Sequence, residues 1–213
     1  GLFNNPSDIA VGNGEVFVSD TGNDRIQVFE TDGSYLRQFG TTGTGDGELN
    51  SPAGILYDAG KLYVVDENNL RICKFDATTG VFEAQWGSAG PDTGPLYDPV
   101  KIAKDQGGNF YVTDHGSDRV VKFDSSYNYL EYWGASEPID PSDPELFHQP
   151  YNCCIDSAGL IYITDEYNNL VKVFDASGTL QDSWSFTNAV VGIEYDAAND
   201  WIYVASGTEV FRC

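Results

Sequence analysis

An apolar strand pattern, a polar turn and a second strand pattern occur together four times, and this repeat constrains the fold more than any other feature. The copies are VFVSDTGNDRIQVF from Val16, LYVVDENNLRICKF from Leu62, FYVTDHGSDRVVKF from Phe110 and IYITDEYNNLVKVF from Ile161, with a shortened copy, IYVASGTEVFRC, from Ile202. The aspartates of the full copies, named pivot aspartates below, are Asp20, Asp66, Asp114 and Asp165, at intervals of 46, 48 and 51 residues. This period fits a four-stranded propeller blade and is too long for ankyrin or leucine-rich units.

Each unit contains the patterns of four short strands. A proline precedes an apolar run in each of the four units: Pro6, Pro52, Pro99 and Pro150. Proline is tolerated at the first position of a strand. A turn with Gly or Asn leads to the strand that ends in the pivot aspartate, and a polar turn leads to a third strand such as 25–29. An outer strand ends in Phe39, Trp86, Trp133 or Trp184. No segment shows an uninterrupted helical period, so the sequence predicts an all-β propeller of four-stranded antiparallel blades.

The fifth unit departs from this pattern. It has Ser206 in place of the pivot aspartate, and Cys213 lies near the end of its third strand. We expect one propeller domain over 1–213, with units at about 3–48, 49–95, 96–146, 147–185 and 186–213. A five-bladed ring from a longer parent is the favoured interpretation, and part of a six-bladed ring is the alternative. Since no methionine occurs, processing or truncation before Gly1 is expected.

The repeat resembles that of the NHL-repeat β-propellers, named after an Asn-His-Leu triplet in the turn after the second strand. Asn68-Asn69-Leu70 and Asn168-Asn169-Leu170 come nearest to the triplet, and Asn23-Asp24-Arg25 and Ser117-Asp118-Arg119 show a related form. The closing aromatic-Gly pairs also match: Phe39-Gly40, Trp86-Gly87 and Trp133-Gly134. The resemblance covers nearly the whole chain and implies a propeller fold. Some NHL propellers bind RNA through a basic face.

The recurring charged residues are interpreted as structural. We expect each pivot aspartate to accept backbone N–H groups of its own turn, as Asx turns do. Arginines recur five residues after the pivot, at Arg25, Arg71 and Arg119, with Leu170 in the fourth unit. We expect these arginines to pair with an acid of a neighbouring blade rather than to bind a ligand.

The composition restricts the partners. The chain has 33 acidic and 11 basic residues, a net charge of -22, spread along its length. Nucleic acid and anionic membranes are disfavoured because both require clustered Lys and Arg. No stretch is long and apolar enough to span a membrane, so membrane insertion is not expected. The charge itself indicates a soluble surface, with cation binding or a salty habitat as the alternatives.

The four cysteines, Cys73, Cys153, Cys154 and Cys213, show no CxxC spacing, which makes zinc binding unexpected. Cys153 and Cys154 are adjacent in a strand and therefore point to opposite faces. The even count and the processed N-terminus favour an extracellular or cell-surface chain with one or two disulfides. Buried free thiols are the alternative.

Candidate binding residues gather in loops expected on one side of the propeller. The turn after the second strand and the connector between blades should emerge on the same side, because antiparallel strands alternate in direction. The candidates there are His115, His148, Tyr167, Asp140, Asp143 and Glu145. Long loops on a rigid scaffold are common binding sites. The stretch 135–149 is the longest insertion and reads as a stiff polar loop, although its acids would also suit calcium.

No catalytic motif is present, and no cofactor or metal is predicted. Peptide-amidating lyases resemble this chain in fold and hold zinc with several histidines near inner-strand starts. Only His148 lies at such a start here, so that role is not carried over. We therefore predict a non-catalytic recognition or assembly module whose partner is a protein or another copy. One alternative is a propeller lyase or hydrolase with a divalent metal in its channel, held by His115, His148 and an acid. The other is a subunit of an extracellular fibre or surface layer.

Overall fold

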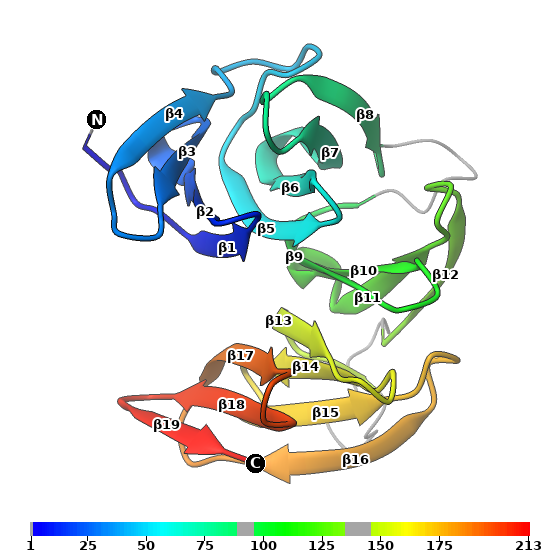
Figure 1. Ribbon diagram of the computed structural model, residues 1–213. Helices are drawn as coiled ribbons and strands as arrows, with labels where there is room; N and C mark the ends of the chain where they lie inside the picture. Colours follow the sequence, from blue (N-terminus) through cyan, green and yellow to red (C-terminus); the bar gives the residue numbers. More distant parts are fainter. Residues whose placement is uncertain (1, 89–95, 135–145) are drawn as a thin grey trace. The chain divides into compact units, whose positions relative to one another are not determined.

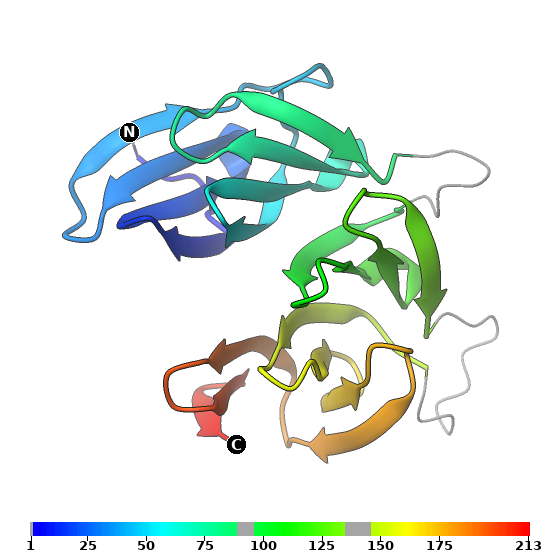
Figure 2. The same cartoon turned by 45° about the vertical axis from the view of Figure 1, so that its right-hand side comes forward.

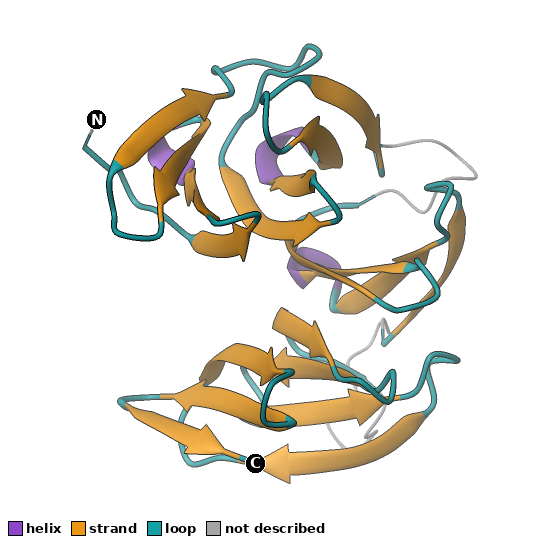
Figure 3. Ribbon diagram, viewed as in Figure 1, coloured by secondary structure: helices purple, strands orange, loops and turns teal. Residues whose placement is uncertain are grey.

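The computed structural model describes residues 2–88, 96–134 and 146–213. The chain divides into two compact units, Gly1–Ile102 and Ala103–Cys213. Strands form five antiparallel sheets, each ordered along the chain from its first strand to its last (Figure 1). This is the all-β propeller architecture that the repeat predicts, with five blades. The described residues contain no α-helix, and the helical segments are three single 3₁₀ turns (Figure 3).

The strand bounds follow the sequence pattern closely. Blade one has β1 (Asp8–Gly12), β2 (Glu15–Asp20), β3 (Arg25–Glu30) and β4 (Tyr35–Phe39). Blade two has β5 (Pro52–Asp58), β6 (Lys61–Asp66), β7 (Arg71–Asp76) and β8 (Phe82–Trp86). Blade three has β9 (Pro99–Lys104), β10 (Phe110–Asp114), β11 (Arg119–Phe123) and β12 (Tyr129–Trp133). Blade four has β13 (Pro150–Ile155), β14 (Ile161–Asp165), β15 (Leu170–Phe174) and β16 (Leu180–Ser185). Blade five has β17 (Val190–Asp196), β18 (Trp201–Ser206) and β19 (Glu209–Arg212).

The turn after the second strand has one form in the first three blades. A 3₁₀ turn, η1 (Thr21–Asn23), η2 (Glu67–Asn69) or η3 (His115–Ser117), is followed by a residue in the left-handed region. That residue is Asp24, Leu70 or Asp118, with φ near +50°. The turn brings the pivot aspartate directly opposite the residue five positions later, as in the pairs Asp20↔Arg25, Asp66↔Arg71 and Asp114↔Arg119.

Neighbouring blades within a unit bury a shared apolar layer. In unit one, Phe17 and Val28 of blade one pack with Ile55 and Val64 of blade two. In unit two, one layer joins blades three and four, and another joins blades four and five. The sheets twist, as the turned view shows (Figure 2). A blade with a neighbour on each side buries apolar residues on both faces of its sheet, and successive residues of a strand point to opposite faces. This explains the apolar content without long apolar runs.

A buried residue anchors each connector, and the sequence reasoning missed it. Leu49, Leu96 and Phe147 each stand three residues before an opening proline and are almost fully buried. Their side chains lie against Gly40, Gly87 and Gly134, the glycines of the aromatic-Gly pairs. A Cβ on Gly134 would come within 2.2 Å of the Phe147 ring, and its φ is +98°. Glycine is therefore required at this position for two reasons: it lets the buried connector residue approach closely, and it adopts the positive φ of the turn.

The cysteines are thiols, so the predicted disulfides are not seen. Cys73, Cys153 and Cys154 are buried, each in a different apolar layer, and Cys213 is exposed. The adjacent residues Cys153 and Cys154 lie in separate layers because neighbouring strand residues point to opposite faces. The alternative interpretation, buried free thiols that pack as small apolar side chains, fits Cys73, Cys153 and Cys154. An extracellular location stays a prediction.

Thiol labelling should follow this burial. Burial raises the pKa of the Cys73 thiol to about 12, so little thiolate forms at neutral pH. We expect maleimide to label Cys213 alone in the native chain and all four cysteines in denaturant without reductant. Intact mass spectrometry counts the labels. Fewer than four labels after denaturation would reveal a disulfide, and a second label in the native chain would contradict the buried positions.

Candidate binding surface

The four pivot aspartates are fully buried, and three of them tie their blade to the segment that precedes it. Asp20 accepts the backbone N–H of Asn4 at 2.7 Å, and Asp66 accepts that of Asn50 at 2.7 Å. Asp165 accepts the backbone N–H of His148 at 2.8 Å. The expectation that these N–H groups come from the aspartate's own turn is therefore wrong for these three residues. The turn and the connector meet there, as expected of loops on one side.

The turn contributes a side chain instead of backbone. The amide groups of Asn23, Asn69 and Asn168, three residues after the pivot, donate to the carboxylate in blades one, two and four. Burial raises the pKa of Asp20, but its hydrogen bonds from Asn4, Asn23 and neighbouring donors outweigh burial and hold the pKa below its usual range. The carboxylate thus stays ionised.

The recurring arginines pair with the pivot aspartate of their own blade, not with a neighbouring blade. Arg25 and Arg71 each place Nε 2.7 Å from the carboxylate, and Arg119 places a terminal nitrogen 2.8 Å away. The reason is the register, since residues directly opposite on adjacent antiparallel strands lie side by side. Arg71 also donates to the connector carbonyls of Thr44, Gly45 and Glu48.

Blade four replaces this arginine by a lysine two residues further along. Leu170 occupies the arginine position, and Lys172 places Nζ 2.8 Å from Asp165. Lys172 also donates to the carbonyl of Leu146 in the connector. The position of Lys172 lies on the same face of the strand because side chains alternate. One cation therefore serves each pivot carboxylate in the four full blades.

Two histidine–tyrosine ring pairs lie in unit two, with His148 and Tyr167 in loops, His115 in η3 and Tyr151 in β13. The His148 ring stacks on the Tyr167 ring with centroids 4.6 Å apart and planes at 25°. The His115 ring meets the Tyr151 ring edge-on, with centroids 6.1 Å apart. Tyr167 and Tyr151 remain 63% and 37% exposed. These four residues, named the aromatic surface below, join the turns of blades three and four to the start of β13.

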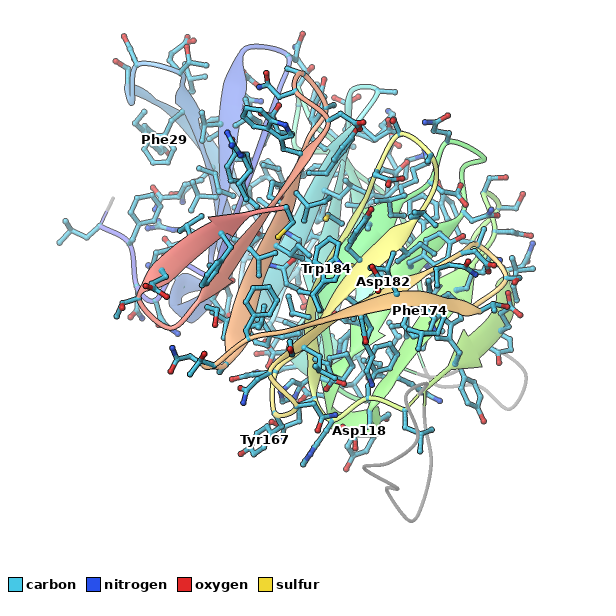
Figure 4. All side chains as sticks on the ribbon, turned by 90° about the horizontal axis from the view of Figure 1, so that it is seen from below. Phe29, Asp118, Tyr167, Phe174, Asp182 and Trp184 are labelled. Carbon is cyan, nitrogen blue, oxygen red and sulfur yellow. The ribbon has the colours of Figure 1, made fainter. Side chains whose placement is uncertain are left out.

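Backbone contacts hold the aromatic surface in place. The N–H of Tyr167 donates to the carbonyl of His148, and the N–H of Glu166 donates to the carbonyl of Gln149. Asp118 accepts the N–H of Gln149 at 2.7 Å. Asp118 and Tyr167 project at the same end of unit two (Figure 4). The backbones of Glu166 and Tyr167 thus both bind the segment 148–149, and the Asp118 carboxylate binds the same segment.

Of the six binding candidates, the structure brings His148 and Tyr167 together, and it places His115 beside Tyr151. Asp140, Asp143 and Glu145 lie outside the described residues. Tyr151 was missed, although an aromatic residue directly after an opening proline is a signal, since Ser7, Ala53 and Val100 stand there in other units. Within 2–88, 96–134 and 146–213, no three His, Cys, Asp or Glu side chains form a group that could hold a metal ion.

The fold is a β-propeller, and the comparisons support the resemblance of its repeat to NHL repeats. The family model DUF5128, a 6-bladed beta-propeller, matches residues 1–87. Protein brain tumor of Drosophila melanogaster is 28% identical over 143 residues, which cover 66% of this chain and 13% of that protein. NHL repeat-containing protein 3 of Homo sapiens is 32% identical over 98 residues, covering 44% and 28%. The chain thus spans under a third of either relative.

Among solved structures, catalytically inactive virginiamycin B lyase from Staphylococcus aureus with Quinupristin matches with a TM-score of 0.72. The match has 13% sequence identity and covers 97% of this chain and 66% of that chain. At this identity it shows the fold alone. No helix in the described part of the chain has the length and apolar character needed to cross a membrane. A propeller scaffold with NHL relatives suggests a protein-interaction module.

Proposed function

We propose that the chain is a non-catalytic recognition module that binds a protein partner through the aromatic surface. The observation that carries this proposal is the pair of exposed tyrosines, Tyr151 and Tyr167, each held against a histidine ring. Tyrosine supplies a large contact area and a polar tip at low entropic cost, so it is enriched at binding sites. Preorganised rings lose little freedom on binding.

The surrounding scaffold is suited to this role. Asp165 fixes the backbone of His148, and the carboxylate itself is fixed by Lys172 and Asn168. The rings are therefore held by buried elements that hydrogen bonds and an ion pair connect, rather than by isolated loops. The described residues contain no group of His, Cys, Asp or Glu side chains that could hold a metal ion. The tyrosines offer ring surface for contact rather than a reactive group. This geometry favours recognition over chemistry.

A peptide library displayed on phage tests the proposal. The library is selected on the immobilised wild-type chain, and enriched peptides are measured on the variant Tyr151→Ala/Tyr167→Ala. We expect the double variant to lose at least about tenfold in affinity, because central aromatic residues contribute on the order of 2 kcal/mol each at interfaces. Fluorescence anisotropy with labelled peptides gives the affinities.

Tyr35→Ala is the matched control, since Tyr35 is 48% exposed and lies in unit one at the start of β4. Peptides should bind this variant as they bind the wild type. Thermal unfolding of each variant verifies that the fold is intact. Selected peptides that ignore Tyr151 and Tyr167, or a selection without any enriched peptide, would contradict the proposed function.

A further inference from the structure

Every basic side chain of this protein is already engaged within the chain. All eleven lysines and arginines lie in the described residues, and nine of them form ion pairs with acids. The other two lie over aromatic rings, Lys104 over Phe110 at 5.3 Å and Arg212 over Trp201 at 4.1 Å. The cations therefore serve internal contacts, and the charge presented to a partner is that of the remaining acids.

The acids outnumber these cations three to one, with 33 against 11. Two of them belong to the segments that hold the stacked rings: Glu166 directly precedes Tyr167 in the chain, and Asp118 accepts the N–H of Gln149, the residue after His148. Asp118 accepts the N–H of Gln149 through one carboxylate oxygen. A field of one sign around an exposed ring face raises the local concentration of oppositely charged groups.

We propose that the partner segment that docks on the aromatic surface is cationic and places a lysine or arginine side chain on Tyr167, beside Asp118 and Glu166. This inference rests on the proposed function and adds the chemistry of the partner. A cation over a tyrosine face is attracted by the ring quadrupole, and neighbouring carboxylates add to the attraction. Charge complementarity also disfavours polyanions, including nucleic acid, as the occupant.

The chain itself provides examples of this contact. The Arg119 guanidinium lies 5.1 Å from the ring centroid of Tyr132 while it pairs with Asp114, so one arginine uses a tyrosine face and a carboxylate together. We expect Tyr167 and the nearby acids Asp118 and Glu166 to offer the same two features to an external side chain. Arginine fits best, because its planar guanidinium stacks on rings and forks onto carboxylates.

The test uses four labelled probes on the full chain: a hexapeptide of alternating arginine and glycine, its citrulline analogue, its glutamate analogue, and a single-stranded RNA hexamer. Fluorescence anisotropy is recorded at low salt and at about 0.15 M salt, where the Debye length is about 8 Å. We expect the arginine peptide to bind, with weaker binding at the higher salt. The citrulline, glutamate and RNA probes should not bind.

Variants locate the binding. Tyr167→Ala should weaken the arginine peptide about threefold to thirtyfold, the range of a cation over an aromatic ring. Glu166→Gln should weaken it about twofold to fivefold, as for an exposed ion pair. Tyr35→Ala should bind as the wild type does. Equal binding of Tyr167→Ala and wild type would mean diffuse attraction to an acidic surface and would overturn the site.

The outcomes separate this inference from the proposed function. Library peptides that require Tyr151 and Tyr167 but carry no net positive charge would leave the recognition role standing and overturn the cationic partner. Binding of the citrulline peptide as tightly as the arginine peptide would also overturn it, as would binding of the RNA probe. Library peptides indifferent to both tyrosines would contradict the proposed function itself.

Discussion

Replacing Lys172 with methionine is expected to lower the free energy of unfolding by about 3–5 kcal/mol, because the change leaves a buried carboxylate without its cation. Asp165 is fully buried and Lys172 is 2% exposed, with Nζ and the carboxylate 2.8 Å apart. The remaining donors, the N–H of His148 and the amide of Asn168, are neutral. A domain is commonly stable by only about 5–15 kcal/mol, so this loss is large. Urea denaturation followed by circular dichroism measures it.

A second variant distinguishes the loss of the ion pair from a packing defect. Lys172→Met combined with Asp165→Asn removes both charges and keeps an acceptor for the N–H of His148. We expect the double variant to be more stable than Lys172→Met alone, since no charge is then buried without a partner. Lys61→Met is the control, because Lys61 and its acidic partners are solvent-accessible and its removal should change the denaturation midpoint little. A double variant no more stable than the single one would show that the pair contributes little.

The sequence was sufficient to predict the blades. Pivot aspartates follow the opening prolines by 14 or 15 residues, and the alternating apolar residues between them have one strand interpretation. The observed outer strands β4, β8 and β12 end at the predicted aromatic residues Phe39, Trp86 and Trp133. Turn chemistry and strand period are local properties, and local properties repeat visibly in a tandem array.

Contacts between side chains of different elements were harder to predict. The arginine of each unit was assigned to a neighbouring blade, because the sequence does not show that a 3₁₀ turn brings Asp66 and Arg71 directly opposite each other. The buried connector residues were missed for a related reason. A single apolar residue in a polar loop, such as Leu49 between Glu48 and Asn50, carries no period, and only the packing on Gly40 reveals its role.

The candidate binding surface was predicted in part. His148 and Tyr167 were placed on one side of the propeller from strand direction alone, and the structure stacks their rings. Tyr151 lies in a strand rather than a loop, so a search confined to loops could not find it. Its exposure depends on its position next to Pro150 at the start of β13, where the strand begins beside the turn of blade three.

Truncating Phe147 to alanine should destabilise the chain by about 3–5 kcal/mol, the usual cost of removing a buried aromatic ring. The ring is 1% exposed, lies 5.4 Å from the ring of Phe174 between centroids, and covers Gly134. The measurement is again urea denaturation. The slope of the transition is compared with that of the wild type to verify that the variant unfolds in the same way.

Because Phe147 directly precedes His148, its loss should also loosen the aromatic surface, and a peptide selected on the wild type should bind Phe147→Ala more weakly. Leu49→Ala is the matched control: Leu49 is the equivalent connector residue of unit one and is fully buried, so this variant should lose about 2–5 kcal/mol of stability without a change in peptide affinity. If Phe147→Ala and Leu49→Ala bind the peptide equally well under conditions where both are folded, the connector anchors only the blade and does not position the rings.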